Sequence, residues 1–213
     1  DCTDAFAKAI AACAAAGGGR VVVPEGRYLS GPIHLRGNVN LHVSRGATIA
    51  FLTDPARYLP LVFTRWEGME CMNYSPFIYA FEARNVAITG EGTLDGQSDN
   101  THWWPWKGRA EYGWKKGGDK QDKARAALAQ MVEDGVPVAK RVFGEGSYLR
   151  PQFVQPYRCE NVLIEGVTIV NSPMWEIHPA LCRNVTVRGV TVKTHGPNND
   201  GCDPECSKDV LIE

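Results

Sequence analysis

The chain has 213 residues, which is enough to bury a sizeable core in one large domain or two small ones. Its formal net charge of −1 gives no electrostatic basis for binding nucleic acid or an anionic membrane, so we expect neither as a partner. No apolar run approaches the length of a bilayer span, and no signal peptide is visible, although the chain begins at Asp1 without a methionine.

The seven cysteines lack the paired spacing of a zinc site. No CxxC pair occurs, and no pair of histidines accompanies Cys202 and Cys206. We therefore expect no metal and no cofactor. An odd number of cysteines leaves both disulfides and buried free thiols open.

The first sixteen residues predict an amphipathic helix. Its apolar face carries Phe6, Ile10 and Cys13, and the glycines at 17–19 end it. A short strand at 21–23 follows. The helix is expected to cover one end of a structure that is otherwise β, without a chemical role.

A short phrase recurs from residue 38 onward, in which asparagine or aspartate precedes alternating apolar residues. It begins at Asn38, Asn85, Asn161, Asn184 and Asp209. The last three are 23 and 25 residues apart, and the first two are 47 apart, about two such periods. Complete units consist of a strand, a glycine and another strand. Such a period without intervening helices predicts an all-β fold, a right-handed parallel β-helix.

The same alignment predicts how side chains stack between coils. The repeated asparagines are suited to bonding local backbone and to forming a ladder, while the alternating aliphatic residues fill the interior. Cys159 and Cys182 each lie two residues before an aligned asparagine, so they fall on successive coils. A disulfide is geometrically feasible there, but we favour an inward ladder of thiols.

Residues 97–146 interrupt the repeats. This stretch holds Trp103, Trp104, Trp106 and Trp114, many charges, and a helical run at 120–134. We expect a partly helical excursion that packs outside the β-helix beside a groove. Clustered tryptophans can stack on sugar faces, but they more often fasten a loop to its scaffold.

Three stretches together resemble a known family: GGGRVVVPEGRYLSGPIHL, NSPMWEIHP and GPNNDGCDPECSKDVLIE. The first occurs in many pectin-lyase-like β-helices, and the last is much more specific. With the repeats, they resemble the polygalacturonase-like glycoside hydrolases of glycoside hydrolase family 28, especially the bacterial exo-acting branch. The resemblance spans nearly the whole chain except the Trp-rich excursion.

That family carries the motifs Asn-Thr-Asp, Asp-Asp, Gly-His-Gly and Arg-Ile-Lys. Asn198-Asn199-Asp200 matches the first, with Asn199 in place of threonine, and the other motifs are not in the chain. The resemblance therefore implies that residues 1–213 form a single β-helix domain truncated at its C-terminus. The remaining C-terminal rungs, with the acid, would be its partner in the same protein.

The resemblance implies a secreted or periplasmic enzyme that hydrolyses α-1,4-galacturonosidic bonds with inversion, acting on pectic polysaccharide or oligogalacturonides. Asp200 would be a water-activating carboxylate, opposite an acid that protonates the leaving oxygen. Neighbouring parallel strands lie about 4.8 Å apart. A partner one coil on, offset sideways, would thus reach the roughly 6.5–9.5 Å separation that inversion requires. The fragment alone is expected to be inactive.

Aligning the coils on their asparagines predicts two columns of side chains. One column contains Gln152, Trp175 and Asp200, and the other contains Gln155, His178 and Asp203. We expect substrate contacts from the following residues: Asn198, Asp203, His178, Trp175 and Arg150. Two alternatives stay open, because Trp175 would also fit packed in a turn and His178 bonded to local backbone. Asp203, next to a proline, would also suit a turn that binds backbone N–H groups.

Other functions remain open. A rhamnogalacturonan or other uronide hydrolase would use the same scaffold, and the missing subsites would distinguish it. A pectate lyase is disfavoured because Asp200 and Asp203 alone make a thin calcium site. A non-catalytic β-helix that binds carbohydrate is the alternative from a different class of protein.

Overall fold

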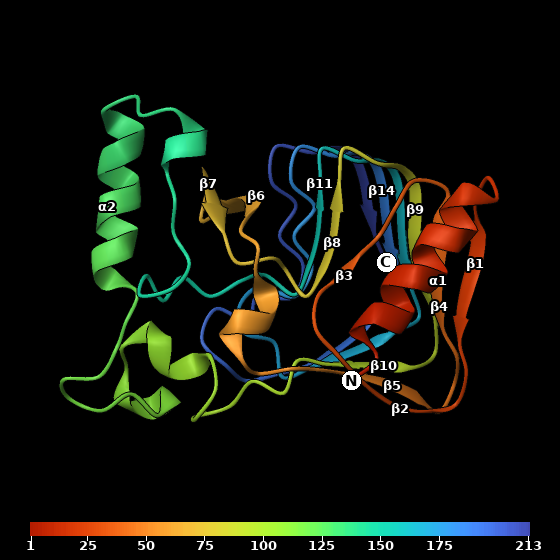
Figure 1. Ribbon diagram of the computed structural model, residues 1–213, viewed down its shortest axis with the longest axis horizontal. Coiled ribbons are helices and arrows are strands. Elements are labelled where there is room, and N and C mark those ends of the chain that lie inside the picture. Colours follow the sequence, from red (N-terminus) through yellow and green to blue (C-terminus); the bar gives the residue numbers. More distant parts are fainter.

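The computed structural model describes residues 1–213 and shows a parallel β-helix (Figure 1). The first sheet has six strands in the order β1 (Gly19–Val23), β4 (Val39–Val43), β9 (Arg84–Gly90), β12 (Glu160–Glu165), β14 (Arg183–Arg188) and β16 (Lys208–Ile212). The second has five, in the order β15 (Thr191–Lys193), β13 (Thr168–Val170), β10 (Thr93–Asp95), β5 (Ala47–Phe51) and β2 (Gly26–Ser30). The third has three, in the order β11 (Val154–Tyr157), β8 (Ile78–Phe81) and β3 (Ile33–His34). The predicted β-helix is confirmed.

An asparagine ladder runs along the outside of the turn before the first sheet. Each amide nitrogen donates to the side-chain oxygen of the preceding coil, at 2.8 Å for Asn85 to Asn38, Asn161 to Asn85 and Asn184 to Asn161. All four residues have a positive φ, between 55° and 62°. Asparagine tolerates this left-handed conformation better than most residues, so one residue type satisfies both the turn and the ladder. The predicted ladder is confirmed.

Glycine is required where two coils approach closely at the next corner. Gly90 has a φ of +111°, and a Cβ there would lie 2.1 Å from the carbonyl oxygen of Val43. This explains why a glycine separates the two strands of the repeat.

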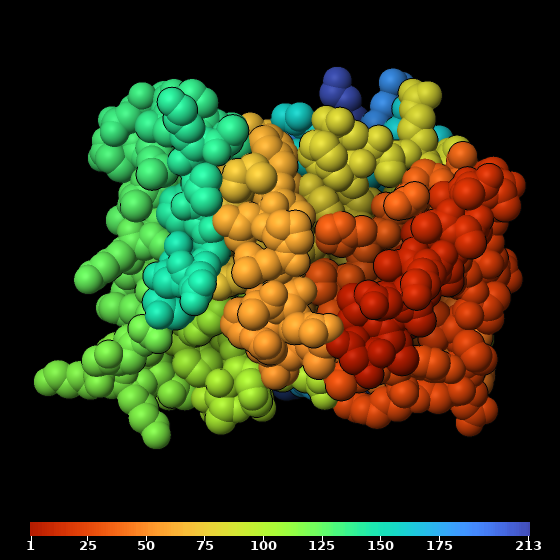
Figure 2. Space-filling model, viewed as in Figure 1, coloured from red at the N-terminus to blue at the C-terminus, as the bar shows by residue number.

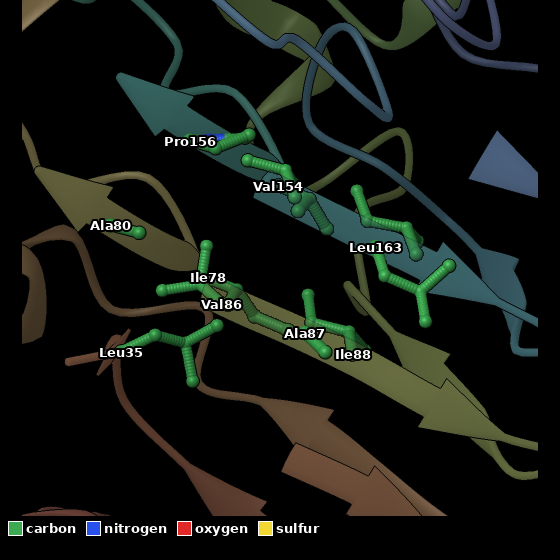
Figure 3. Close-up of a pocket in the computed structure, with 11 residues that line it drawn as sticks. Leu35, Ile78, Ala80, Val86, Ala87, Ile88, Val154, Pro156 and Leu163 are labelled. Carbon is green, nitrogen blue, oxygen red and sulfur yellow. The ribbon is translucent and has the colours of Figure 1, made fainter. Parts of the chain in front are cut away.

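The interior is filled by the aliphatic residues that alternate along the strands. Val39, Leu41, Val86, Ile88 and their counterparts on later coils are buried in one continuous core. Figure 3 shows a narrow apolar gap beside these strands, with labelled side chains from β8, β9 and β11 around it. No titratable side chain lines this gap, so it offers packing and no chemistry.

The predicted N-terminal helix is α1 (Thr3–Ala15), which buries Phe6 and Ile10 against the first coils. Figure 1 shows it lying across the β-helix beside β1 and β4. No helix of the structure has the length and apolar character needed to cross a membrane.

All seven cysteines are free thiols. Cys159 and Cys182 are each 2 % exposed, and the Cys159 backbone N–H points at the Cys182 Sγ, 3.4 Å away. The favoured inward ladder of thiols is therefore confirmed, and no disulfide joins these coils.

Two segments lie outside the coils. The predicted Trp-rich, partly helical insertion contains the 3-10 turns η2 (Trp104–Lys107), η3 (Ala110–Tyr112) and η4 (Val138–Lys140) and the helix α2 (Asp122–Glu133). The other segment carries a 3-10 turn, η1 (Pro55–Tyr58), and an antiparallel hairpin of β6 (Val62–Trp66) and β7 (Met69–Asn73). In Figure 2 this orange segment separates the green insertion from the red N-terminal coils.

The tryptophans of the insertion mainly fasten it to the scaffold. Trp103 is 2 % exposed and packs edge-on to Tyr58 at a centroid distance of 5.3 Å. The Trp104 indole N–H donates to the Ser172 carbonyl oxygen at 2.8 Å. Hydrophobic burial and this hydrogen bond together hold the insertion against the β-helix.

Candidate functional site

The candidate site surrounds the Asp200 loop, residues 194–201, which leads from β15 back to the third sheet. Isolated parallel bridges extend that sheet, from Val154 to Ile177 to Cys202 and from Tyr157 to Ala180 to Glu205. The register confirms the two predicted columns, which are Gln152, Trp175, Asp200 and Gln155, His178, Asp203. The sequence alignment thus placed the polar residues correctly along the coils.

Asn199 holds the Asp200 loop in shape. Its side-chain oxygen accepts from the Gly196 N–H at 2.6 Å, and its amide nitrogen donates to the Met174 carbonyl oxygen at 2.8 Å. The side chain therefore bonds both within the loop and to the coil below. Asp200 follows it as an exposed carboxylate, on a backbone that its neighbour has fixed.

Asn198 is held by two cations. Its side-chain oxygen accepts from Lys107 Nζ and from Arg150 Nη2, each at 2.8 Å. Arg150 Nη1 also donates to the carbonyl oxygens of Pro173 and Pro197, at 2.8 and 2.7 Å, and Nε donates to Gln121 Oε1 at 3.2 Å. These bonds link the loop to the insertion.

Arg150 has no exposed surface. Burial lowers the pKa of its guanidinium to about 9. We predicted a substrate contact for Arg150, but a side chain that is enclosed and bonded in this way supports the loop from inside and cannot reach a sugar.

His178 is also fully buried. Its Nδ1 accepts from the Gln155 side-chain amide at 2.9 Å, so Nε2 carries the proton and donates to Glu205 Oε2 at 2.9 Å. The other Glu205 oxygen lies 2.8 Å from Arg65 Nε. The predicted substrate contact of His178 is thus replaced by a role in orienting Glu205, because the imidazole has no surface to offer.

The pKa of Glu205 reflects this arrangement. Burial pushes it upward, but the hydrogen bonds from His178 and Arg65 outweigh burial, so the pKa lies below its ordinary value. Glu205 is therefore a carboxylate bound to a buried histidine and to an arginine of the hairpin.

Trp175 is partly buried beside His178. The two rings meet edge to face at 4.9 Å, and the indole packs against the small hydrophobic cluster that includes Met174 and Trp66. Its Nε1 is enclosed and has no hydrogen-bond partner. The structure thus shows the packed arrangement that the sequence left open for Trp175.

Two further carboxyl groups lie within the field of Asp200. Burial and then the Asp200 charge raise the pKa of Asp203 to about 6. Burial also raises the pKa of Glu176 to about 8, with the charges of Asp200 and Asp203 adding to the effect. Each has one enclosed oxygen without a partner, Oδ2 of Asp203 and Oε1 of Glu176. Asp200 therefore lies near two carboxyl groups whose pKa values are raised by burial, and of these Glu176 holds its proton at neutral pH.

Sequence reasoning missed the β6–β7 hairpin, whose Val62 and Phe63 pack against Tyr79, Tyr157 and Ala180 of the third sheet and its extension. Thr64 bonds Gln155, Arg65 pairs with Glu205, and the Trp66 indole N–H donates to the Arg150 carbonyl oxygen at 3.0 Å. Figure 1 shows β6 and β7 between α2 and the strands β8 and β11. Their antiparallel pairing lies outside the repeat, so the period does not reveal them.

No group of three or more His, Cys, Asp or Glu side chains is placed to hold a metal ion. The carboxyl groups of Glu176 and Asp203 and the guanidinium of Arg150 lie instead within the field of the exposed Asp200 carboxylate. This arrangement suits proton transfer and the binding of an anionic or polar ligand.

Comparison with known proteins places the site in a family context. Residues 142–213, which hold Asp200, match the model of "Glycosyl hydrolases family 28". The whole chain superimposes on a hyperthermoactive exopolygalacturonase from Thermotoga maritima with a TM-score of 0.98 and 57% sequence identity, covering 47% of that chain. A family 28 exopolygalacturonase from Yersinia enterocolitica gives a TM-score of 0.71 at 25% identity, with 99% of this chain and 39% of that one covered.

A curated relative, a probable polygalacturonase from Vitis vinifera, is 25% identical over 205 residues, or 92% of this chain. The chain spans 34% of that relative's length and less than half of each of the two solved structures.

Proposed function

This chain belongs to glycosyl hydrolase family 28, and on that premise we propose that the protein containing it hydrolyses α-1,4-galacturonosidic bonds in pectic polysaccharide or oligogalacturonides. The observation that carries the proposal is the exposed Asp200 carboxylate on a loop clamped by Asn199 and Arg150, inside the family-matching region. A rigidly placed carboxylate is what a base that activates water requires.

Hydrolysis with inversion needs a base and an acid on opposite faces of the sugar. We assign Asp200 the role of base, which removes a proton from the water that attacks the anomeric carbon. The acid protonates the leaving oxygen, and we propose that another part of the full-length protein supplies it.

The surroundings of Asp200 favour an anionic sugar. Lys107 uses one N–H on Asn198 Oδ1, and an ammonium group has three N–H donors, so two remain for a uronate carboxylate. Burial and the charge of Arg150 lower the pKa of Lys107, while Glu67 opposes them. Lys107 therefore gives the insertion a part in substrate recognition.

The hairpin supports action at a chain end. Over the third sheet it contacts Tyr79, Gln155 and Glu205, which lie on three different coils before or at the level of Asp200. A polymer that runs along this sheet past Asp200 would meet the hairpin on the side of the N-terminal coils. We infer exo cleavage, with the hairpin, more than the Trp-rich insertion, blocking one end of the substrate path.

The test is release of reducing sugar from polygalacturonate by the full-length protein. Replacing Asp200 with asparagine removes the base and is expected to lower kcat by about 10²–10⁴-fold. Asp4→Asn, on the exposed side of α1, is the matched control. Monogalacturonate as the sole early product, released as the inverted anomer in an NMR time course, would support exo action with inversion.

Two outcomes would count against the proposal. Full activity of the Asp200→Asn variant would remove Asp200 from the mechanism. Binding of polygalacturonate without any release of reducing ends would favour the non-catalytic carbohydrate binder.

A further inference from the structure

A glutamate inside the β-helix supports the peptide next to Asp200. Glu176 has no exposed surface, and its Oε2 accepts a hydrogen bond from the Gly201 N–H at 2.7 Å. The Gly201 carbonyl oxygen accepts from the Ile177 N–H at 3.0 Å. Both polar groups of the Gly201 residue are thus held by the coil below.

The surroundings of Glu176 are unusual for a carboxyl group. In the preceding coil the equivalent position is Phe153, which is fully buried and packs edge-on to Phe51 and at a tilt to Phe77, each at a ring-centroid distance of 5.2 Å. In the following coil it is Gly201, whose φ of +85° is left-handed and whose backbone N–H points at the carboxyl group. A glutamate in an aromatic column carries a burial cost that simple packing would not require.

We propose that Glu176 is a positioning residue for Asp200: by accepting the Gly201 amide bond it fixes the adjoining peptide and so fixes where the Asp200 carboxylate stands. This inference rests on the proposed hydrolase function and deepens it. Glu176 does not touch the substrate, because it is enclosed.

The protonation state fits this role. The enclosed Oε1 has no partner, and the neighbouring charges of Asp200 and Asp203 oppose a third negative charge. Burial first, and then these charges, raise the pKa of Glu176 to about 8, so Glu176 is a neutral acid at neutral pH. A neutral acceptor holds the loop without repelling an anionic sugar, and glutamine reproduces it closely.

Two variants of similar size separate the acceptor from packing. Glu176→Gln keeps an oxygen for the Gly201 N–H, whereas Glu176→Met fills the space without one. In the full-length protein we expect the methionine variant to lower kcat by about 10–100-fold, since a displacement of about 1 Å costs this much. KM should stay within about threefold, and glutamine should restore kcat to within about threefold.

Amide exchange gives a second readout. The Gly201 N–H should exchange faster in the methionine variant than in the wild type and the glutamine variant, because only methionine removes its acceptor. Glu165→Ala, on the outer face of β12, is the control that should change neither quantity.

The outcomes distinguish this inference from the proposed function. An active wild type with equal kcat values for the glutamine and methionine variants overturns the role of Glu176 alone. Unchanged Gly201 exchange in the methionine variant also overturns it. A wild type that releases no sugar overturns the proposed function, and this inference with it.

Discussion

Arg150 offers the sharpest test of how the Asp200 loop is held. Its guanidinium donates to Gln121, Asn198 and the carbonyl oxygens of Pro173 and Pro197, and no part of it is exposed. The change Arg150→Met keeps much of the volume and removes all four bonds. The perturbation therefore isolates the polar clamp from packing.

Opposing effects set how much stability the Arg150→Met variant loses. A hydrogen bond from a charged donor contributes about 1.5–3 kcal/mol net, and a buried acceptor left alone costs about 1–3 kcal/mol. Removing a buried charge offsets part of this loss of stability, because no carboxylate pairs directly with Arg150. We expect the free energy of unfolding to fall by roughly 2–5 kcal/mol, with Arg150→Lys losing less.

The assay is equilibrium unfolding in urea of the full-length protein, monitored by tryptophan fluorescence and by circular dichroism. Arg158→Met is the matched control, since Arg158 is partly exposed and pairs with Glu70 and Glu82 at the surface. Exposed pairs contribute about 0–1 kcal/mol. An Arg150→Met variant no less stable than the Arg158→Met control would refute the clamp.

Three further predictions test the coils by the same urea assay. Gly90→Ala should cost more than about 3 kcal/mol, since its Cβ would lie 2.1 Å from the Val43 carbonyl oxygen. Gly17→Ala is the control, because Gly17 has a similar positive φ but open space around its Cβ position, and it should lower the free energy of unfolding by about 1–2 kcal/mol. Equal losses in the two variants would contradict the steric argument. Asn161→Gly removes two ladder bonds and should lower the free energy of unfolding by about 1–2 kcal/mol; no loss would argue against the ladder. Asn161→Ala should lose more, because the φ of residue 161 is +57°; the reverse order would argue against backbone strain there. The pKa of Glu176 is raised in the folded state to about 8 from 4.5. The folded chain therefore holds an extra proton between these values, and stability should fall as pH rises through this range. Glu176→Gln should flatten that fall, so parallel stability curves for variant and wild type would show that Glu176 does not titrate there.

The repeat in the sequence was enough by itself to predict the parallel β-helix. Asn161, Asn184 and Asp209 recur at nearly one coil length, and the strands that follow alternate apolar and polar residues. Parallel coils stack with little freedom in register, because a one-residue slip would expose the interior face. For that reason the alignment also placed Cys159 and Cys182 on successive coils and Asp200 in the column of Trp175.

Only the tertiary structure decided what the polar residues near Asp200 do. His178, Trp175 and Arg150 have the right coil positions for substrate contacts, but side chains from outside the repeat cover them. The β6–β7 hairpin and the insertion cover them, and the placement of both depends on contacts between residues far apart in sequence. Thr64 bonds Gln155, 91 positions away, and Trp104 bonds Ser172, 68 positions away.

The pattern along one coil therefore determines which way a side chain points, and packing between distant segments determines whether it reaches solvent. Asp200 is exposed on its loop, whereas Glu176 is enclosed and accepts the N–H of Gly201, the residue after Asp200. A period in the sequence records stacking between coils. It does not record burial by a hairpin that belongs to no coil, which is why the support beneath Asp200 became visible only in three dimensions.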